Sequence, residues 1–380
     1  MASPYRADHV GSLLRPPELI QARTDHAEGR ITAEQLAEAE DAAVLKALDL
    51  QREAGISIFT DGEYRRPAWS ATIRQAVDGL VPDAVQPTVR LLGAWQGPSR
   101  DLANAALASP AGTQPMVVGG KLRQVRRIAG ADATFLREHA PGPWKITMPG
   151  PVSAAGQLYK PGLSELFYPT RADLVAELIE MQRREIAALI DDGISYFQLD
   201  SLHYVERVAD TTIRPQMIAE GEDPDTYLDM LIEADNAVLA GARRDGLTVG
   251  LHMCRGNNRS AWHAEGSYEA IAEKAFNLLD VDRFLLEYDT DRAGGFEPLR
   301  FVPASKMVVL GLISSKLPAP EPIDLLRRRI DEAAQHVPLE RLAISPQCGF
   351  ASTVLGNLLT WDEMRRKLEL IAETARVVWG

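Results

Sequence analysis

Residues 249–254, Val249-Gly250-Leu251-His252-Met253-Cys254, form a short apolar run that ends in two side chains able to bind a metal. Similar β-rich runs recur along the chain, and each ends in Gly, Pro or a polar residue before a longer helical pattern. This alternation is typical of βα units around a parallel sheet. Eight such runs predict a closed (β/α)8 TIM barrel. The predicted strands end near Val10–Ser12, Phe59–Asp61, Ile146–Met148, Phe197–Asp200, Gly250–His252, Leu285–Glu287, Leu310–Leu312 and Ala343–Ser345.

The helices between these runs carry their own start and stop signals. Thr32 with Gln35, and Thr360 with Glu363, have the spacing of capping boxes, in which side chains satisfy the first N–H groups of a helix. Gly55 and Gly193 are predicted helix stops. After Thr170, apolar residues repeat at helical spacing, which predicts a helix packed on the sheet: Leu174, Leu178, Met181 and Leu189.

The regular alternation breaks between residues 65 and 142. This stretch is rich in Pro and Gly and has short strand-like runs at Val89–Leu92 and Met116–Val118. Loops at the carboxyl end of a barrel tolerate extra structure. We therefore expect one barrel domain over residues 1–380, with residues 65–142 inserted after the second strand.

Composition and charge indicate a globular protein and disfavour some classes of partner. The 380 residues are 46% hydrophobic and 25% charged, close to the globular average. With 41 Lys and Arg against 53 Asp and Glu, the net charge is −12, which disfavours nucleic acid and anionic membranes as partners. The chain shows neither a membrane-spanning apolar run nor the apolar core of a signal peptide, so we expect a cytoplasmic protein.

Four residues at the ends of predicted strands are candidate zinc ligands. His252 and Cys254 are two apart, so they project to the same face of a strand. Glu287 ends the next strand, and Cys348 follows the last one. In a barrel these strand ends share one rim, and imidazole, thiolate and carboxylate are the ligands that zinc prefers. Taken singly, His252, Cys254 and Cys348 are each better explained as packed core residues, and a Cys254–Cys348 disulfide is a further alternative. Taken together, they favour zinc.

The charge of this ligand set favours one kind of chemistry. Two thiolates and one carboxylate around a divalent cation leave the site at −1, which suits activation of a bound thiol as a thiolate nucleophile. Hydrolytic zinc sites rely more on neutral imidazole. The set therefore favours thiol alkylation over hydrolysis.

The sequence resembles the catalytic, C-terminal half of cobalamin-independent methionine synthase, and in particular the short single-barrel relatives of that enzyme. The resemblance covers nearly the whole chain. It rests on the combination of His9–Ser12, Asp61–Glu63, Met148–Val152, Gln198–Asp200, His252–Cys254, Leu286–Tyr288 and Gln347–Gly349. It implies that His252, Cys254, Glu287 and Cys348 are the zinc ligands, in agreement with their spacing.

The resemblance also implies a pocket for homocysteine. Ser12 and the neighbouring backbone would hold the carboxylate, and Glu63 and Asp200 would hold the ammonium group, since a desolvated ammonium needs charge-assisted hydrogen bonds. The alternative for Glu63 and Asp200 is ordinary polarity of the barrel rim, or pairing with Arg65 or Arg66.

Several positions depart from the family. The N-terminal barrel that helps the longer enzyme bind methyl-folate is absent from this sequence. Gln157 stands where the family stacks the pterin on Trp, and Ser315-Lys316 stands where the family has a His that protonates the leaving group. Lys316 is therefore the candidate acid, with a pKa that would need tuning. The polar loop Arg255–Arg259 could meet an anionic donor or only solvent.

These observations predict a zinc-dependent methyltransferase that converts homocysteine to methionine, with a folate or another methyl donor. The alternative is alkyl transfer to another thiol, as in epoxyalkane:coenzyme M transferase. A sulfonate thiol, however, would call for basic residues rather than the Glu63 and Asp200 carboxylates. A zinc hydrolase or decarboxylase on a related barrel is a further alternative, and a non-catalytic binding module fits the ligand set least.

Overall fold

The computed structural model describes residues 5–83, 95–97, 99–103, 115–242 and 245–380. Its core is a six-stranded parallel sheet in which each strand pairs with the next along the chain. Apart from the half-buried first residue of the fifth of these strands, every strand residue is buried, because helices cover the sheet. The strands are β3 Lys145–Pro149, β4 Tyr196–Asp200, β5 Thr248–Met253, β6 Arg283–Glu287, β7 Met307–Ile313 and β8 Leu342–Pro346.

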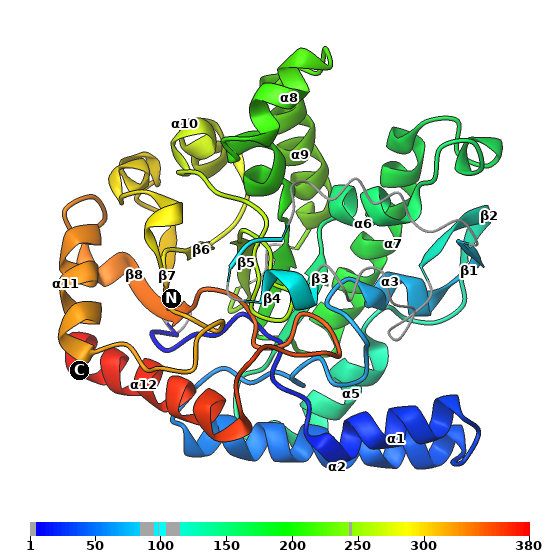
Figure 1. Cartoon of the computed structure of the whole chain (residues 1–380), viewed down its shortest axis with the longest axis horizontal. Coiled ribbons are helices and arrows are strands. Elements are labelled where there is room, and N and C mark those ends of the chain that lie inside the picture. Colours follow the sequence, from blue (N-terminus) through cyan, green and yellow to red (C-terminus); the bar gives the residue numbers. More distant parts are fainter. Residues whose placement is uncertain (1–4, 84–94, 98, 104–114, 243–244) are drawn as a thin grey trace.

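Helices surround the sheet on its outside (Figure 1). The capping boxes at Thr32 and Thr360 are both formed. Gly55 and Gly193 follow helix ends with φ of 84° and 86°, as predicted. The helices are α1 Pro17–Ala27, α2 Ala33–Glu53, α3 Ala71–Ala76, α5 Gly130–His139, α6 Pro151–Leu158, α7 Arg171–Asp191, α8 Ile213–Ala219, α9 Pro224–Leu239, α10 Glu269–Leu278, α11 Ile323–Ala333 and α12 Trp361–Trp379.

The first two predicted strands differ from the expectation, because within the described residues each pairs with the sheet only through a single bridge. Ala7 bridges to Ile344 of β8, and Phe59 bridges to Trp144 just before β3. Side chains bind the backbone groups that a regular ladder would use: the Gln51 amide bonds both N and O of Thr60 at 2.9 Å. The two segments are joined by Leu13 N to Gly62 O at 3.1 Å. The result is an α/β fold of the TIM-barrel type, completed at one seam by side chains.

Residues 65–142 carry additional structure before β3. β1 Val77–Pro82 and β2 Met116–Gln124 form a separate antiparallel pair, seen at the right of Figure 1. The predicted run at 116–118 is the start of β2, whereas the predicted run at 89–92 lies outside the described residues. Gln96 pairs with Trp262, and Ser99 Oγ donates to Arg259 O. This part of the chain therefore rests on the loop that follows β5.

A buried network of charged and polar side chains lies within the ring of strands. Lys145 and Asp8 are both fully buried and pair at 2.8 Å, and Arg283 reaches the other oxygen of Asp8 at 3.4 Å. Lys145 Nζ also donates to Gln198 Oε1 at 3.0 Å. Gln198 Nε2 in turn donates to Asp200 Oδ1 at 2.7 Å. The network therefore extends along β4 and fixes Asp200 at the carboxyl end of the sheet.

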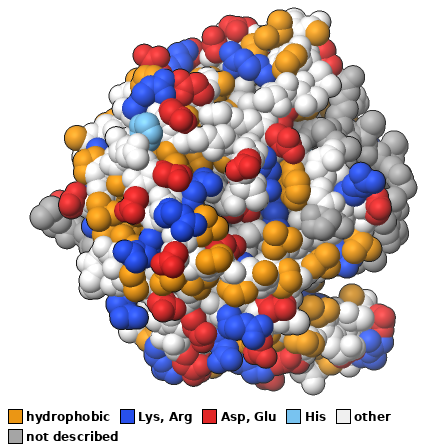
Figure 2. All heavy atoms as spheres, turned by 60° about the vertical axis from the view of Figure 1, so that its left-hand side comes forward, with side chains coloured by type: hydrophobic (Ala, Val, Ile, Leu, Met, Phe, Trp, Pro, Cys, Tyr) orange, Lys and Arg blue, Asp and Glu red, His pale blue; other side chains and the backbone are white. Residues whose placement is uncertain are grey.

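The surface carries charges of both signs. Acidic and basic side chains are interspersed on the face shown in Figure 2, so the excess of negative charge is not gathered there. Among the described residues, no helix combines the length and the apolar character needed to cross a bilayer.

Candidate metal centre and substrate cleft

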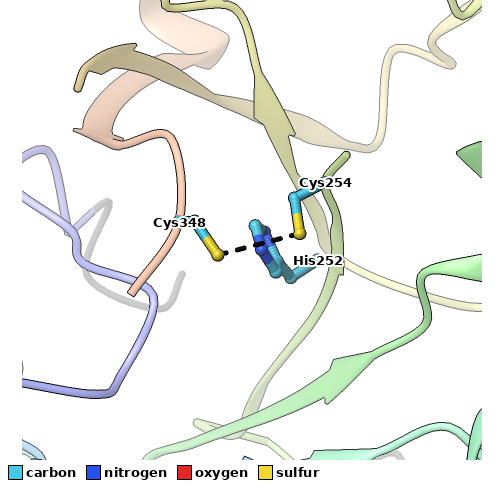
Figure 3. Close-up of side chains that lie close together, drawn as sticks. All are labelled: His252, Cys254 and Cys348. Carbon is cyan, nitrogen blue, oxygen red and sulfur yellow. Dashed lines mark hydrogen bonds between the residues drawn. The ribbon is translucent and has the colours of Figure 1, made fainter. Parts of the chain in front are cut away.

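Three of the four predicted ligands lie together at the carboxyl ends of the strands. His252 is the fifth residue of β5, Cys254 follows that strand, and Cys348 lies two residues after β8. Their nitrogen and sulfur atoms are all within 4.8 Å of one another, and all three residues are buried. Figure 3 shows the three side chains converging from two loops and one strand. The two sulfur atoms are 3.7 Å apart, and both cysteines are free rather than joined in a disulfide.

This geometry fits a tetrahedral zinc ion. Two Zn–S bonds of about 2.3 Å at a tetrahedral angle place the sulfurs about 3.8 Å apart, close to the observed separation. His252 Nδ1 lies 3.2 Å from the Leu285 carbonyl oxygen. Its Nε2 is buried and has no hydrogen-bond partner among the described residues. A backbone carbonyl that binds one ring nitrogen and leaves the other free is how proteins orient a metal-binding histidine.

The electrostatics of the group couple the two thiols and the imidazole. The hydrogen bond between the thiols raises the pKa of Cys254 and lowers the pKa of Cys348. Burial alone would lower the pKa of His252, but the negative charge on the nearby Cys348 sulfur and on Asp200 raises the pKa overall. Cys348 is therefore the more readily ionised of the two thiols.

Glu287, the fourth predicted ligand, is buried at the end of β6 but is held by other groups. Its Oε2 accepts from Arg255 N at 2.7 Å, and its Oε1 accepts from Arg292 Nη2 at 2.6 Å. Burial favours the neutral acid, but Lys316, Arg292 and Arg255 together lower the pKa of Glu287 to about 2. The structure therefore places an ionised carboxylate beside the centre without bringing it into the group of three.

The three residues predicted to bind the amino-acid part of a thiol line one cleft with the metal centre. Ser12, Glu63 and Asp200 share this cleft with His252 and both cysteines. Ser12 Oγ accepts from Ala351 N at 3.4 Å, and the serine is itself adjacent to Gly349.

Glu63 pairs with Arg66, one of the two alternatives for this residue. Arg66 Nη2 lies 2.7 Å from Glu63 Oε1, and both side chains are buried. Thr147 Oγ1 also donates to Oε1, at 3.0 Å. Glu63 has φ of 63°, directly after Gly62 at 66°, so two successive left-handed residues turn its side chain into the cleft.

Burial dominates the electrostatics of Asp200. Burial raises the pKa of Asp200 to about 7, although the neighbouring His252 acts in the opposite direction. Its Oδ1 accepts a hydrogen bond from the neutral Gln198 amide at 2.7 Å. Near neutral pH this carboxyl group is thus divided between its neutral and ionised forms.

Lys316, the candidate acid, follows β7 and is only 2% exposed. Its Nζ has no hydrogen-bond partner among the described residues. Its charge lowers the pKa of Glu287 and of Cys348, so it lies within electrostatic reach of the metal centre. Lys316 is not among the described residues that line the cleft.

Further residues line the cleft that the sequence did not single out as ligands. Leu202 forms an apolar cluster with the two cysteines, and the half-buried Trp69 packs against that cluster. Asn257 donates from Nδ2 to Gly349 O at 2.7 Å. Asn257 belongs to the polar loop whose role the sequence left open. In that loop Arg255 is fully buried and bonds Gly266 O and Glu287 O, so it faces neither solvent nor a donor. Only the loop's position after Cys254 hinted at Asn257.

Gln157, which stands where the family has its pterin-stacking Trp, makes a polar contact. Gln157 Oε1 accepts from Ser70 Oγ at 2.7 Å. At this position the chain therefore has a hydrogen-bonded amide where the family has an aromatic ring.

Comparison with known proteins defines the class to which this fold and centre belong. Residues 167–377 match the family model described as the catalytic domain of cobalamin-independent synthase. The chain is 37% identical to the uncharacterized protein YxjH of Bacillus subtilis, over 99% of this chain and 95% of that protein. The chain belongs to the cobalamin-independent methionine synthase catalytic domain family.

More distant relatives agree with this assignment. A methionine synthase of Pyrococcus abyssi is 24% identical over 90% of this chain and 84% of its own length. A structure from Listeria monocytogenes, described as a candidate vitamin B12-independent methionine synthase, superposes with a TM-score of 0.71 at 26% identity, covering 100% of this chain and 99% of that one. A B12-independent methionine synthase from Shewanella sp. W3-18-1 shares the fold, with a TM-score of 0.72 at 19% identity over 98% of this chain and 97% of that chain.

Proposed function

We propose that this protein is a zinc-dependent thiol methyltransferase that transfers a methyl group to homocysteine and forms methionine. One observation carries the proposal: His252, whose Nε2 has no hydrogen-bond partner among the described residues, and the two cysteines, whose sulfurs are 3.7 Å apart, line the same cleft as Ser12, Glu63 and Asp200. A metal-activated thiolate and an amino-acid site would thus share one space.

The residues present suit zinc as the cofactor. His252, Cys254 and Cys348 would hold the ion, with Glu287 as the proposed fourth ligand. A zinc ion bound there would lower the pKa of a substrate thiol and stabilise it as a thiolate at neutral pH. Arg255 N and Arg292 bind the Glu287 carboxylate and hold it ionised in the form that a ligand requires.

The remaining residues would orient the thiol. Ser12 and the backbone beside it would bind the carboxylate of homocysteine, and Asp200 with Glu63 would bind its ammonium group. Fixing both ends of the amino acid holds its sulfur at one place and makes attack on the methyl donor an oriented reaction.

In the transfer step the substrate sulfur forms a bond to the methyl carbon as the bond from that carbon to the donor breaks. The donor keeps the electron pair of the broken bond and takes up a proton. We propose Lys316 as the source of that proton, since it is a buried cation close to the centre without a hydrogen-bond partner in the described residues. The donor is a folate or another methylated compound.

The experiment that tests the function combines zinc analysis with calorimetry. Wild type and Cys348→Ser are compared for bound zinc and for homocysteine binding, with Ser153→Ala as the control because the buried Ser153 hydroxyl has no hydrogen-bond partner among the described residues and Ser153 does not line the cleft. We expect one zinc per wild-type chain and homocysteine binding that releases a proton. Both should be lost in Cys348→Ser and kept in Ser153→Ala.

The other outcomes decide between the alternatives. Zinc without homocysteine binding, together with binding of coenzyme M, would transfer the proposal to the coenzyme M alkyltransferases. Absence of stoichiometric zinc from the wild type after reconstitution would refute the mechanism. Formation of methionine from homocysteine and a methyl-folate, followed by mass spectrometry, then tests the donor.

A further inference from the structure

The carbonyl oxygen of Gly349 accepts hydrogen bonds from side chains of two other loops. Asn257 Nδ2, from the loop after β5, donates to it at 2.7 Å. Ser315 Oγ, from the loop after β7, donates to it at 2.9 Å. Gly349 directly follows Cys348, and Asn257 is the third residue after Cys254. The two proposed sulfur ligands are thus tied together by one shared acceptor.

A wider set of buried amides and hydroxyls supports this junction. Asn357 Nδ2 donates to Ser315 O at 2.7 Å, and Asn357 Oδ1 accepts from Ser260 N at 3.0 Å. All of these side chains are at most 7% exposed. Hydrogen bonds in such a setting are shielded from water and hold their geometry well.

The sheet itself does not fix the distance between the two sulfurs. β5 and β8, which carry the two cysteines at their ends, are separated in the sheet by β6 and β7. No ladder hydrogen bond therefore runs between the strands that position Cys254 and Cys348. Both sulfurs also lie beyond the strand ends, where only contacts between loops can set their separation.

We propose that Asn257 and Ser315 are positioning residues that hold Cys254 and Cys348 at ligating distance through the Gly349 carbonyl. The inference rests on the proposed metal centre. Residues that support ligands without touching the metal typically change metal affinity 10- to 100-fold when they are replaced, so we expect an effect of about that size.

The experiment measures metal binding rather than turnover. Zinc affinity is determined by competition with a chromophoric chelator, and Co²⁺ is titrated in parallel so that the thiolate-to-cobalt absorption reports the geometry of the two sulfurs. The test variants are Asn257→Ala, Asn257→Asp and Ser315→Ala. Asn257→Asp keeps the size of the side chain but faces the Gly349 carbonyl with an acceptor instead of a donor.

Two further variants serve as controls. Ser315→Thr keeps the hydroxyl donor and should bind metal as the wild type does. Asn258→Ala removes the neighbouring amide, whose Oδ1 has no hydrogen-bond partner among the described residues, and should also bind normally. Thermal unfolding of each variant in the presence of a chelator identifies any that fail to fold; Asn257→Asp and Ser315→Ala then test the same contacts independently.

We expect Asn257→Ala, Asn257→Asp and Ser315→Ala to weaken zinc binding about 10- to 100-fold and to change the cobalt spectrum. Wild-type affinity and spectrum in these folded variants would overturn the inference and leave the proposed function standing. If the wild type binds zinc but neither binds nor methylates homocysteine, the proposed function fails while the positioning role is still decided by metal affinity. A wild type that binds no zinc overturns both.

Discussion

The substitution Gly349→Ala tests how tightly the loop after β8 is packed against the start of the chain. A Cβ at this position would lie 1.9 Å from Ser12 Oγ, 3.1 Å from Ser12 Cβ and 3.4 Å from Ser12 N. Non-bonded atoms at ordinary contact are about 3.5 Å apart, so the two segments must separate by up to about 1.6 Å. Rotation of the serine hydroxyl relieves only the shortest contact, because Cβ and N remain in place.

We expect Gly349→Ala to lower the free energy of unfolding by about 1–3 kcal/mol, as overpacked cores do. A displacement of about 1 Å at a reacting centre can cost about 100-fold in rate, so homocysteine methylation should fall further than stability suggests. Urea denaturation followed by circular dichroism measures the first effect, and zinc competition with turnover measures the second.

A second substitution makes the reasoning specific to the Ser12 contact. Combining Gly349→Ala with Ser12→Ala removes the atom at 1.9 Å but leaves the Cβ at 3.1 Å, so stability should be restored in part. The coupling between the two changes should be about 0.5–3 kcal/mol. Gly156→Ala in α6 is the control, because its Cβ meets only His203 at 3.4 Å and alanine favours a helix. Wild-type stability of Gly349→Ala, or no gain in the double variant, would refute the packing argument.

Three further predictions each concern one ionisable side chain. Homocysteine affinity should rise by up to about tenfold per pH unit until about pH 7, because in the proposed site the ammonium group binds the ionised form of Asp200. Calorimetry between about pH 5.5 and about pH 8 measures this rise, which should be absent from Asp200→Asn. Burial raises the pKa of Asp235 to about 7, so the folded state keeps its proton while the unfolded state ionises near pH 3.9. Stability should therefore fall by up to about 1.4 kcal/mol per pH unit between these values, and denaturation of Asp235→Asn should show a flatter profile. Lys316→Met should lower the rate of methyl transfer about 10²- to 10⁴-fold, and unchanged turnover would exclude Lys316 as the acid.

The strand pattern predicted most of the fold because burial on both faces leaves a clear signal. The run ending at His252 and the run ending at Asp200 are both fully buried strands. The first two runs look the same in sequence but form single bridges. The amides of Gln51 and Gln198 bind Thr60 and Val10 in place of a strand ladder, and no local periodicity reveals a side chain that acts across the fold.

The candidate centre was predictable where spacing alone fixes geometry. His252 and Cys254 share a strand face, and the barrel rim brings Cys348 to them, as expected. The cross-loop contact of Asn257 with Gly349 was not predictable, because its donor and acceptor are 92 residues apart and neither belongs to a periodic pattern. Only the assembled loops show that this amide joins the two sulfur-bearing segments.

The state of each carboxylate around the cleft depends on partners that a motif does not specify. Glu63 and Glu287 each form an ion pair with an arginine, Glu63 with Arg66 at 2.7 Å and Glu287 with Arg292 at 2.6 Å. Asp200 instead accepts from the neutral amide of Gln198, and burial raises its pKa to about 7. Binding of an ammonium group would therefore release the proton of Asp200, and the carboxylate formed would pair with the ammonium. Glu63 would instead have to share a negative charge that Arg66 already balances. In the proposed amino-acid site, Asp200 is for this reason the carboxylate on which recognition of the ammonium group depends most.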